Sequence, residues 1–172
     1  MPPVAKFIKE IHNKSIGNIK ALSIREHRFP FLVKVKNWNR FSKNTGGTFV
    51  EKCCHFFDLM CLIIKSKPIS VYASGSQEVN HNNERYGNKR PDIIDNGFVI
   101  VNFKNGVRGL LDLCMFAENS EMQEELSAVG DKGKIETYNF KVGKYPKSSY
   151  VSTIILLLSI IFSDFLPEGA IR

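Results

Sequence analysis

The sequence GGTFVEKCCHFFDLM, residues 46–60, is the most informative stretch of this chain. Its two adjacent glycines predict a tight turn, and the run after them predicts a helix over residues 48–65 that ends before Pro68. Glu51 and His55 are four positions apart, so on a helix their side chains would lie on one face. A carboxylate held beside an imidazole is suited to proton transfer.

Each of these residues also has a purely structural interpretation. Thr48 and Glu51 have the spacing of a capping box, in which both side chains bind free N–H groups of the first helical turn. His55 has apolar neighbours and would equally suit a buried, hydrogen-bonded core position. Asp58 could orient the imidazole or be an ordinary hydrogen-bond partner. The sequence leaves these alternatives open.

Three of the four cysteines, Cys53, Cys54 and Cys61, lie in the same predicted helix. Adjacent helical residues diverge by about 100°, so Cys53 and Cys54 cannot both face one ion together with His55, and we expect no metal site. Cysteines placed in this way do not form a disulfide framework, and no secretory signal opens the chain. We therefore expect reduced thiols and a cytoplasmic protein.

Composition indicates one folded domain with a real core, because 43% of the 172 residues are hydrophobic. The net charge is +7, but the basic residues are scattered along the chain. Neither a nucleic-acid-binding module nor a dense basic stripe is present, so we expect no nucleic-acid partner.

The remaining elements alternate between helix and strand patterns. Residues 2–13 predict an amphipathic helix, and residues 18–27 predict a strand. One further strand is expected over residues 69–76. Two hairpins are expected as well, one pairing residues 98–103 with 107–116 and one pairing residues 124–129 with 134–140. Asn105-Gly106, in the first hairpin, is the clearest turn. We predict an α+β fold with an open, mostly antiparallel or mixed sheet whose helices cover one face. The uncovered face would favour a homo-oligomer.

The last part of the chain differs in character. We divide the sequence into a domain over residues 1–140 and an atypical hydrophobic tail over residues 141–172. The uncharged run in the tail, residues 151–162, is shorter than the roughly 20 apolar residues of a membrane-spanning helix. We therefore do not expect a membrane protein, and a tail anchor remains an alternative.

A long loop over residues 28–47 follows the strand 18–27, and loops of that length are commonly functional. Arg25 and His27 at the end of the strand, with Trp38 and Arg40 in the loop, are candidate substrate-binding residues. The alternative interpretation of the two strand residues is a solvated strand edge.

Several segments together resemble one protein family. They are MPPVAKFIKEIHNKSIGNIKALSIREHRFPF, NTGGTFVEKCCHFFDLM, PISVYASG, DNGFVIVNFKNGVRGLLDL and ELSAVGDKGKIE. In this order, over residues 2–138, they are similar to the C-terminal domain of the glucose-fructose oxidoreductase and inositol dehydrogenase (Gfo/Idh/MocA) family.

The resemblance implies an enzyme that oxidises a hydroxyl of a sugar, cyclitol or polyol and passes hydride to NAD or NADP. It implies His55 as general acid/base and Glu51 as its supporting acid, although the family usually has aspartate at the latter position. The family's catalytic lysine, from an E-K-P motif in a preceding Rossmann domain, has no counterpart, because Glu51-Lys52-Cys53 lies in the wrong domain.

No GxGxxG turn for a dinucleotide is present, so the residues that would bind the cofactor are unknown. The first hypothesis is the substrate-binding and oligomerisation domain of an NAD(P)-dependent oxidoreductase, inactive alone. The alternative is a non-catalytic module that binds a polyol or dimerises.

Overall fold

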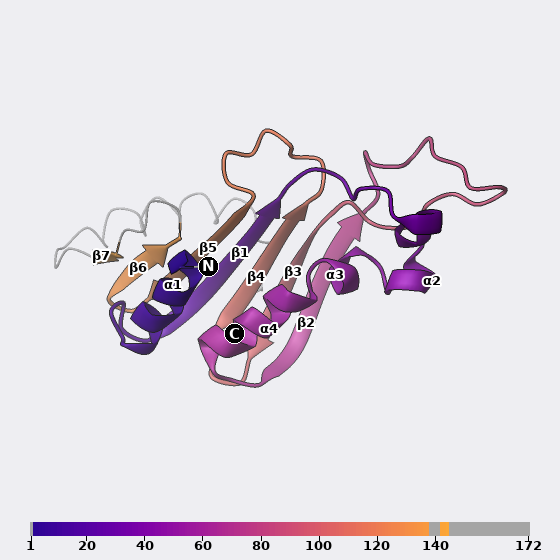
Figure 1. Cartoon of the computed structure of the whole chain (residues 1–172). Helices are drawn as coiled ribbons and strands as arrows, with labels where there is room; N and C mark the ends of the chain where they lie inside the picture. Colours follow the sequence, from indigo (N-terminus) through magenta and orange to yellow (C-terminus); the bar gives the residue numbers. More distant parts are fainter. Residues whose placement is uncertain (1, 138–141, 145–172) are drawn as a thin grey trace, which may run out of the picture.

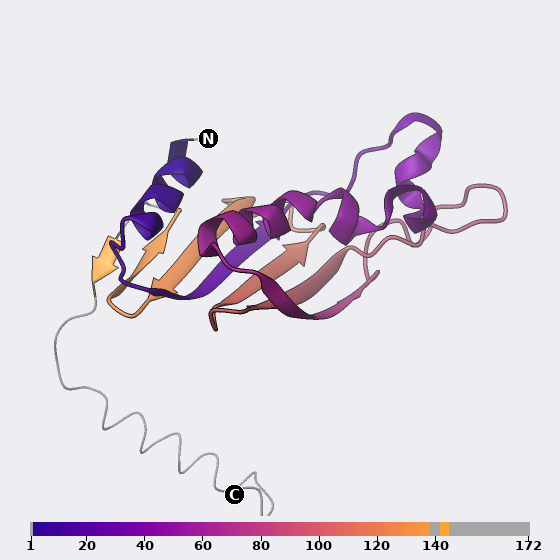
Figure 2. The same ribbon diagram turned by 90° about the horizontal axis from the view of Figure 1, so that it is seen from below.

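The computed structural model of the chain describes residues 2–137 and 142–144. These residues form one open, seven-stranded sheet in the order β2-β3-β4-β1-β5-β6-β7. The helices of the described residues lie on one side of this sheet, and none of these residues forms a layer over the other side in Figures 1 and 2. The predicted α+β class, with an open mixed sheet covered on one face, is confirmed.

The centre of the sheet is strand β1 (Ile19–His27). It runs parallel to β4 (Arg108–Cys114) and antiparallel to β5 (Glu124–Gly130). In the described residues, β1 and β4 form the one parallel pair. β1 and β4 can lie parallel because the chain between them is a long crossover connection, which contains helices and the strands β2 and β3.

Antiparallel pairing builds the two wings of the sheet. On one side, β2 (Pro68–Ser76) pairs with β3 (Asn96–Phe103), which pairs with β4. On the other side, β5 pairs with β6 (Gly133–Glu136), and β7 (Val142–Lys144) forms the edge. The predicted Asn105-Gly106 hairpin is confirmed, and Gly106 has the left-handed φ of +82° that this turn needs.

Helix α1 (Pro2–His12) and helix α4 (Cys54–Ile64) cover one face of the sheet. Each helix buries one apolar stripe: Phe7 and Ile11 of α1, and Phe56, Met60, Ile63 and Ile64 of α4. Gly109 in β4 allows close packing, because an added Cβ would lie 2.8 Å from the sulfur of Met60. The core therefore lies between the helices and the sheet.

The predicted single helix over residues 48–65 is wrong. The chain forms a short helix α3 (Thr48–Glu51), and α4 begins only at Cys54. Cys53 has φ −108° and ψ −3°, outside ordinary helix values. Its side chain is fully buried, and the neighbouring Lys52 is bound to Glu26 of β1. The burial of Cys53 and the ion pair of Lys52 therefore stabilise the interruption between α3 and α4.

Two long connections pack together at the end of the sheet where β1 and β2 finish. The first contains the 3₁₀ helix η1 (Val35–Arg40) and helix α2 (Ser42–Thr45), and the second spans residues 77–95 (Figure 1). The Ser42 N–H and hydroxyl both donate to the Asp92 carboxylate, at 2.6 and 2.9 Å. This end of the molecule holds most of the candidate site.

In the part of the chain that the structure describes, no helix is long and apolar enough to cross a membrane. The hydrophobic run over residues 151–162 lies outside the described residues, as does most of the predicted tail. The division at residue 140 and the cytoplasmic location stay predictions.

Candidate active site

The double glycine shapes the entry to the site. Gly46 ends α2 with φ +80°, and its N–H donates to the Ser42 carbonyl. Gly47 precedes α3 with φ +85° and ψ 173°, a combination that only glycine adopts readily. The two glycines therefore reverse the chain and direct the start of α3 toward the 77–95 connection.

The capping-box interpretation of Thr48 and Glu51, which the sequence left open, does not hold in the structure. The N-cap of α3 is Gly47, which has no side chain to bind the first turn. The Thr48 hydroxyl donates instead to the carbonyl of Ile94 in the second long connection. Glu51 therefore does not take part in capping helix α3.

Glu51 is paired with a lysine that is 17 residues away in the sequence. Lys34 Nζ lies 2.9 Å from Glu51 Oε1, and the Glu51 side chain is only 13% exposed. The other carboxylate oxygen, Oε2, is buried and has no hydrogen-bond partner among the described residues. A buried carboxylate oxygen without a donor is costly, and in this conformation it is closed to solvent.

Trp38 completes this cluster. Lys34 Nζ lies 4.9 Å from the centre of the indole ring, a cation–π distance, and Trp38 is 39% exposed. An aromatic ring beside a carboxylate presents an apolar surface next to a hydrogen-bond acceptor. The predicted substrate-binding residue Trp38 thus lies close to Glu51 through their shared contact with Lys34.

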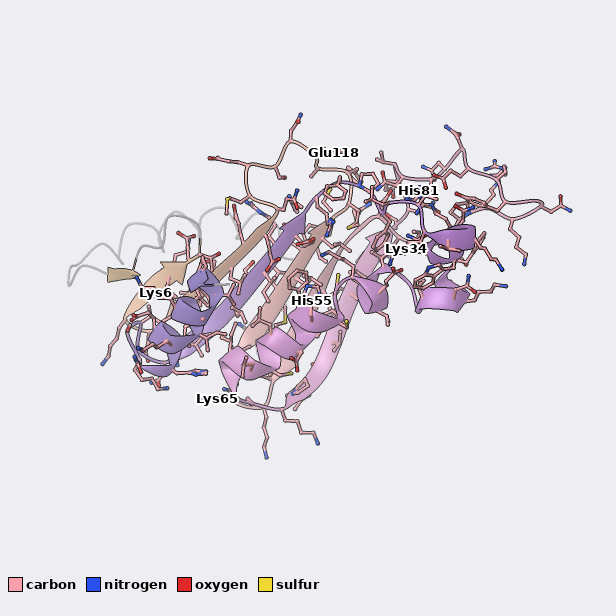
Figure 3. All side chains as sticks on the ribbon, in the orientation of Figure 1. Lys6, Lys34, His55, Lys65, His81 and Glu118 are labelled. Atoms are coloured by element: carbon pink, nitrogen blue, oxygen red, sulfur yellow. The ribbon has the colours of Figure 1, made fainter. Side chains whose placement is uncertain are left out.

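His55 lies near the start of α4 and is exposed. Figure 3 shows His55 on this helix and Lys34 in the connection that leads to α3. The imidazole ring packs 4.0 Å from the Phe56 ring, and in the described residues its nitrogens make no hydrogen bond. The imidazole is therefore available to a ligand.

The relation between Glu51 and His55 differs from the expected one. Because the helix breaks at Lys52 and Cys53, the two residues do not lie on one continuous helix. Glu51 binds Lys34 rather than the imidazole, and Asp58 is exposed without a hydrogen bond to His55. The sequence spacing thus selected two residues on successive helices, and the structure shows no hydrogen bond between them.

Two predicted substrate-binding residues lie elsewhere. Arg25 and His27 point to the open face of the sheet, where they pair with Glu125 and Asp112. Their neighbour Glu26 points to the helix-covered face. The structure therefore does not bring Arg25 and His27 to the side on which α4 carries His55.

Arg40 is near the candidate site in sequence, but its side chain is 2% exposed. Its Nε donates to Glu84 Oε2 at 2.9 Å, across 44 residues of sequence. The Tyr86 hydroxyl and His81 Nδ1 also bind this carboxylate, at 2.6 and 2.7 Å. Arg40 therefore joins the two long connections.

The charge network around Glu84 was not found by sequence reasoning. Burial alone would raise the pKa of Glu84, but the hydrogen bonds from Tyr86, His81 and Arg40 outweigh it and lower the pKa to about 2. Lys34 was similarly missed as the partner of Glu51. A loop lysine has no pattern that names its partner, so only the tertiary structure reveals the pair.

The residues that the structure describes do not fit a dinucleotide or a metal ion. The double glycine follows helix α2 and leads into a helix of four residues, whereas a pyrophosphate site needs a strand, a glycine turn and a long helix. No group of three His, Cys, Asp or Glu side chains within residues 2–137 and 142–144 is placed to hold a metal.

Comparison with known proteins places the chain in a family. Residues 8–155 match the oxidoreductase family, C-terminal alpha/beta domain (GFO_IDH_MocA_C). No curated protein sequence matched the chain.

Solved structures with the same fold are dehydrogenases and oxidoreductases at low sequence identity. A putative oxidoreductase from Thermotoga maritima has a TM-score of 0.66 and 15% identity, over 94% of this chain and 50% of its own. A putative myo-inositol dehydrogenase from Sinorhizobium meliloti has a TM-score of 0.63 and 18% identity, over 78% and 38%. The WlbA dehydrogenase from Bordetella pertussis, in complex with NADH and UDP-GlcNAcA, has a TM-score of 0.62 and 15% identity, over 96% and 50%.

The chain spans half or less of the length of each of these structures. The structural likeness shows a shared fold, and the sequence match covers most of the chain. This protein belongs to the Gfo/Idh/MocA oxidoreductase family, of which it contains the C-terminal α/β domain.

Proposed function

We propose that this chain is the substrate-binding domain of an NAD(P)-dependent oxidoreductase that acts on a hydroxyl of a sugar, cyclitol or polyol. The observation that carries the proposal is the exposed imidazole of His55, which makes no hydrogen bond among the described residues, at the start of the helix that follows the one ending at Glu51. In a family of oxidoreductases, such a pair supports hydroxyl binding and proton transfer.

In this proposal each residue has one task. The Glu51 carboxylate, whose side chain is 13% exposed, accepts a hydrogen bond from a substrate hydroxyl and thereby orients the ring. His55 takes the proton of the reacting hydroxyl as the carbon–oxygen bond becomes a carbonyl. A nicotinamide cofactor supplied from outside this domain would provide the hydride acceptor, so that the alcohol would lose two electrons and two hydrogens in all.

The cofactor has to come from outside the described residues. Relatives in the comparison include structures solved with NADH or NAD, each about twice the length of this chain or more. The chain alone would therefore bind the substrate without turning it over.

A chimera tests this proposal. Residues 2–144 would replace the corresponding domain of the Sinorhizobium meliloti neighbour, and NADH formation would be followed with a panel of polyols. We expect activity that falls roughly 100-fold or more in His55→Ala, the usual scale for a general base. Cys54→Ser is the matched control, since Cys54 is the adjacent exposed residue.

Turnover at the parent rate in His55→Ala would reject the catalytic role. A chimera that binds a polyol but never reduces NAD⁺ or NADP⁺ would favour the alternative, a non-catalytic binding module.

The open face of the sheet supports a second role, in assembly of like subunits. On this face Tyr72 is 71% and Phe98 57% exposed, and Ile100 and Leu110 lie next to them in register. Exposed apolar patches of this kind commonly mark protein interfaces. We propose a homo-oligomer formed through this face.

Light scattering of the purified chain tests the assembly. We expect a mass above that of the monomer, and a monomer in Ile100→Glu. Leu62→Glu is the control, because Leu62 is also apolar and exposed but lies on α4. A wild-type monomer at high concentration would reject the proposal.

A further inference from the structure

Strand β4 places two opposite charges on the open face of the sheet. Arg108 is its first residue, and Asp112 follows four residues later. Alternate residues of a strand point to the same side, and the residues between them at positions 109 and 111 are buried under the helices. Arg108, Leu110 and Asp112 therefore lie in line on the open face, with the apolar residue in the middle.

The middle level of this face is apolar across three strands. Leu110 pairs with Ile100 of β3, and Ile100 pairs with Tyr72 of β2. A hollow of about 260 Å³ is lined by Ile100, Leu110 and Arg108, among others. A second hollow, of about 220 Å³, has Asp112 in its lining. Both hollows are open rather than enclosed, so the side chains of another molecule can reach the two charged residues.

Arg108 and Asp112 both have binding capacity that their own subunit does not use. Arg108 is exposed, and among the described residues its guanidinium makes no ion pair or hydrogen bond. The Asp112 side chain is 26% exposed; His27 Nε2 lies 3.0 Å from its Oδ1, whereas no described residue donates to its Oδ2. About 13 Å of extended strand separates Arg108 from Asp112. Each of them can therefore bind a group of another molecule.

A second copy of the chain offers the complementary charges. Like subunits that pair through one face are related by a two-fold axis, so residue i of one contacts residue j of the other, and j contacts i. An axis that crosses the strands at the level of Leu110 makes the strands of the two sheets run in opposite directions. Leu110 then faces its own copy, and Arg108 of each subunit faces Asp112 of the other. The ion pair forms twice.

An axis parallel to the strands brings like charges together instead. Asp112, Arg25 and Glu125 lie side by side on β4, β1 and β5, at one level of the face. With the axis on β1, Asp112 faces Glu125 and Arg25 faces its own copy; with the axis on β4, Asp112 faces its own copy. Like charges directly opposite each other are destabilising, so the charge pattern disfavours this arrangement.

We propose that the open face binds a second copy of the chain in the antiparallel register, with Arg108 of each subunit bound to Asp112 of the other. The inference rests on the proposed assembly through this face and adds the arrangement of the two subunits. Sheets packed face to face lie about 10 Å apart, a gap that an arginine and an aspartate can span together. The apolar level around Leu110 supplies the buried area, and the two ion pairs fix the register.

Charge reversal tests the register. Arg108→Glu places a carboxylate opposite Asp112 of the second copy, and Asp112→Arg places a guanidinium opposite Arg108. Sedimentation velocity of the full chain would give the dimer dissociation constant. We expect each single variant to raise this constant roughly 100-fold or more, because both contacts then join like charges. Lys9→Glu, an equal change of charge on exposed helix α1, is the matched control and should stay within about twofold of wild type.

A mixture of the two single variants gives a sharper test. In a heterodimer of Arg108→Glu with Asp112→Arg, one contact joins the new glutamate to the new arginine, and the other is the original ion pair. Both contacts are therefore attractive. We expect the mixture to dimerise within about tenfold of wild type, although each variant alone is mainly monomeric. Recovery in the mixture would also show that both variants fold.

Three results would overturn the proposal in different ways. A wild-type chain that stays monomeric at high concentration rejects the proposed assembly, and the register with it. A wild-type dimer that persists in Arg108→Glu and Asp112→Arg, or a mixture of these variants that fails to dimerise, rejects only the register. A dimer that also persists in Ile100→Glu has its interface elsewhere and rejects both.

Discussion

Lys52 Nζ lies 2.9 Å from Glu26 Oε1, and this ion pair joins the central strand to the break between α3 and α4. Arg28 Nη1 binds the same oxygen at 3.3 Å, and Glu26 is only 2% exposed. A carboxylate buried to this degree requires its cations. The pair therefore fixes where one short helix ends and the helix carrying His55 begins.

Glu26→Gln should lower the free energy of unfolding by about 3 kcal/mol, the lower end of the range for a broken buried pair, because Lys52 and Arg28 keep some solvent contact. Urea unfolding of the chain measures this change. The double variant Glu26→Leu with Lys52→Met should recover part of the loss. An unfolding midpoint unchanged by Glu26→Gln would contradict this account.

Gly47→Ala should destabilise the fold by roughly 1–3 kcal/mol, since its backbone lies in a region that residues with a Cβ avoid. Gly87→Ala is the control: its φ is +61°, in the ordinary left-handed region, and a Cβ there would meet no atom within 4 Å. We expect the control to lose about 1 kcal/mol or less. Equal losses in the two variants would show that the turn before α3 tolerates a side chain.

Acid should destabilise the connection over residues 77–95. Burial alone would raise the pKa of Asp95, but N–H donors from Asn80, Glu78 and Val79 outweigh it and keep this pKa below its ordinary value. The pKa of Glu84 is likewise lowered, to about 2. Both carboxylates bind protons more weakly in the folded state, so their contribution is complete above about pH 4.5 and is lost as the pH falls toward 2.

Urea midpoints at pH 7, 4 and 3 measure this loss. Asp95→Asn should show a smaller decrease on acidification than the wild type, because its side chain does not titrate. A decrease of the same size in the variant would assign the acid sensitivity to other carboxylates.

The adjacent thiols should differ in reactivity. Burial, with the nearby charge of Glu26, raises the pKa of Cys53 to about 12, whereas Cys54 is exposed. Iodoacetamide at pH 8 should therefore modify Cys54 in the folded protein and leave Cys53 untouched until the chain unfolds. Tandem mass spectrometry distinguishes the two sites, and Cys54→Ser provides the control. Labelling of Cys53 before the chain unfolds would show that the segment between α3 and α4 opens readily.

Local patterns predicted the elements whose shape depends on near neighbours. The amphipathic period identified α1 and its buried Phe7 and Ile11, and Asn105-Gly106 identified the β3–β4 hairpin. These predictions succeeded because helix stripes and tight turns are encoded within a few residues. The helix over residues 48–65 failed because its break depends on Glu26, which is remote in sequence.

The predictions for the residues of the candidate site can be separated in the same way, into those that depend on local sequence and those that depend on distant segments. Spacing and family resemblance selected Glu51 and His55, and the long loop selected Trp38. Arg25 and His27 were selected because they end the strand that leads into this loop, and alternation places both of them on one face. Alternation does not say which face the helices will cover, and here these two residues occupy the open one.

The sequence by itself therefore determined the family, the α+β class and the double glycine that requires left-handed backbone. Only the tertiary structure decided that β1 lies parallel to β4, that Glu51 pairs with Lys34, and that Arg40 pairs with Glu84. The physical reason is range: turn and helix preferences act between neighbours, whereas these pairs form only when packing brings distant segments together.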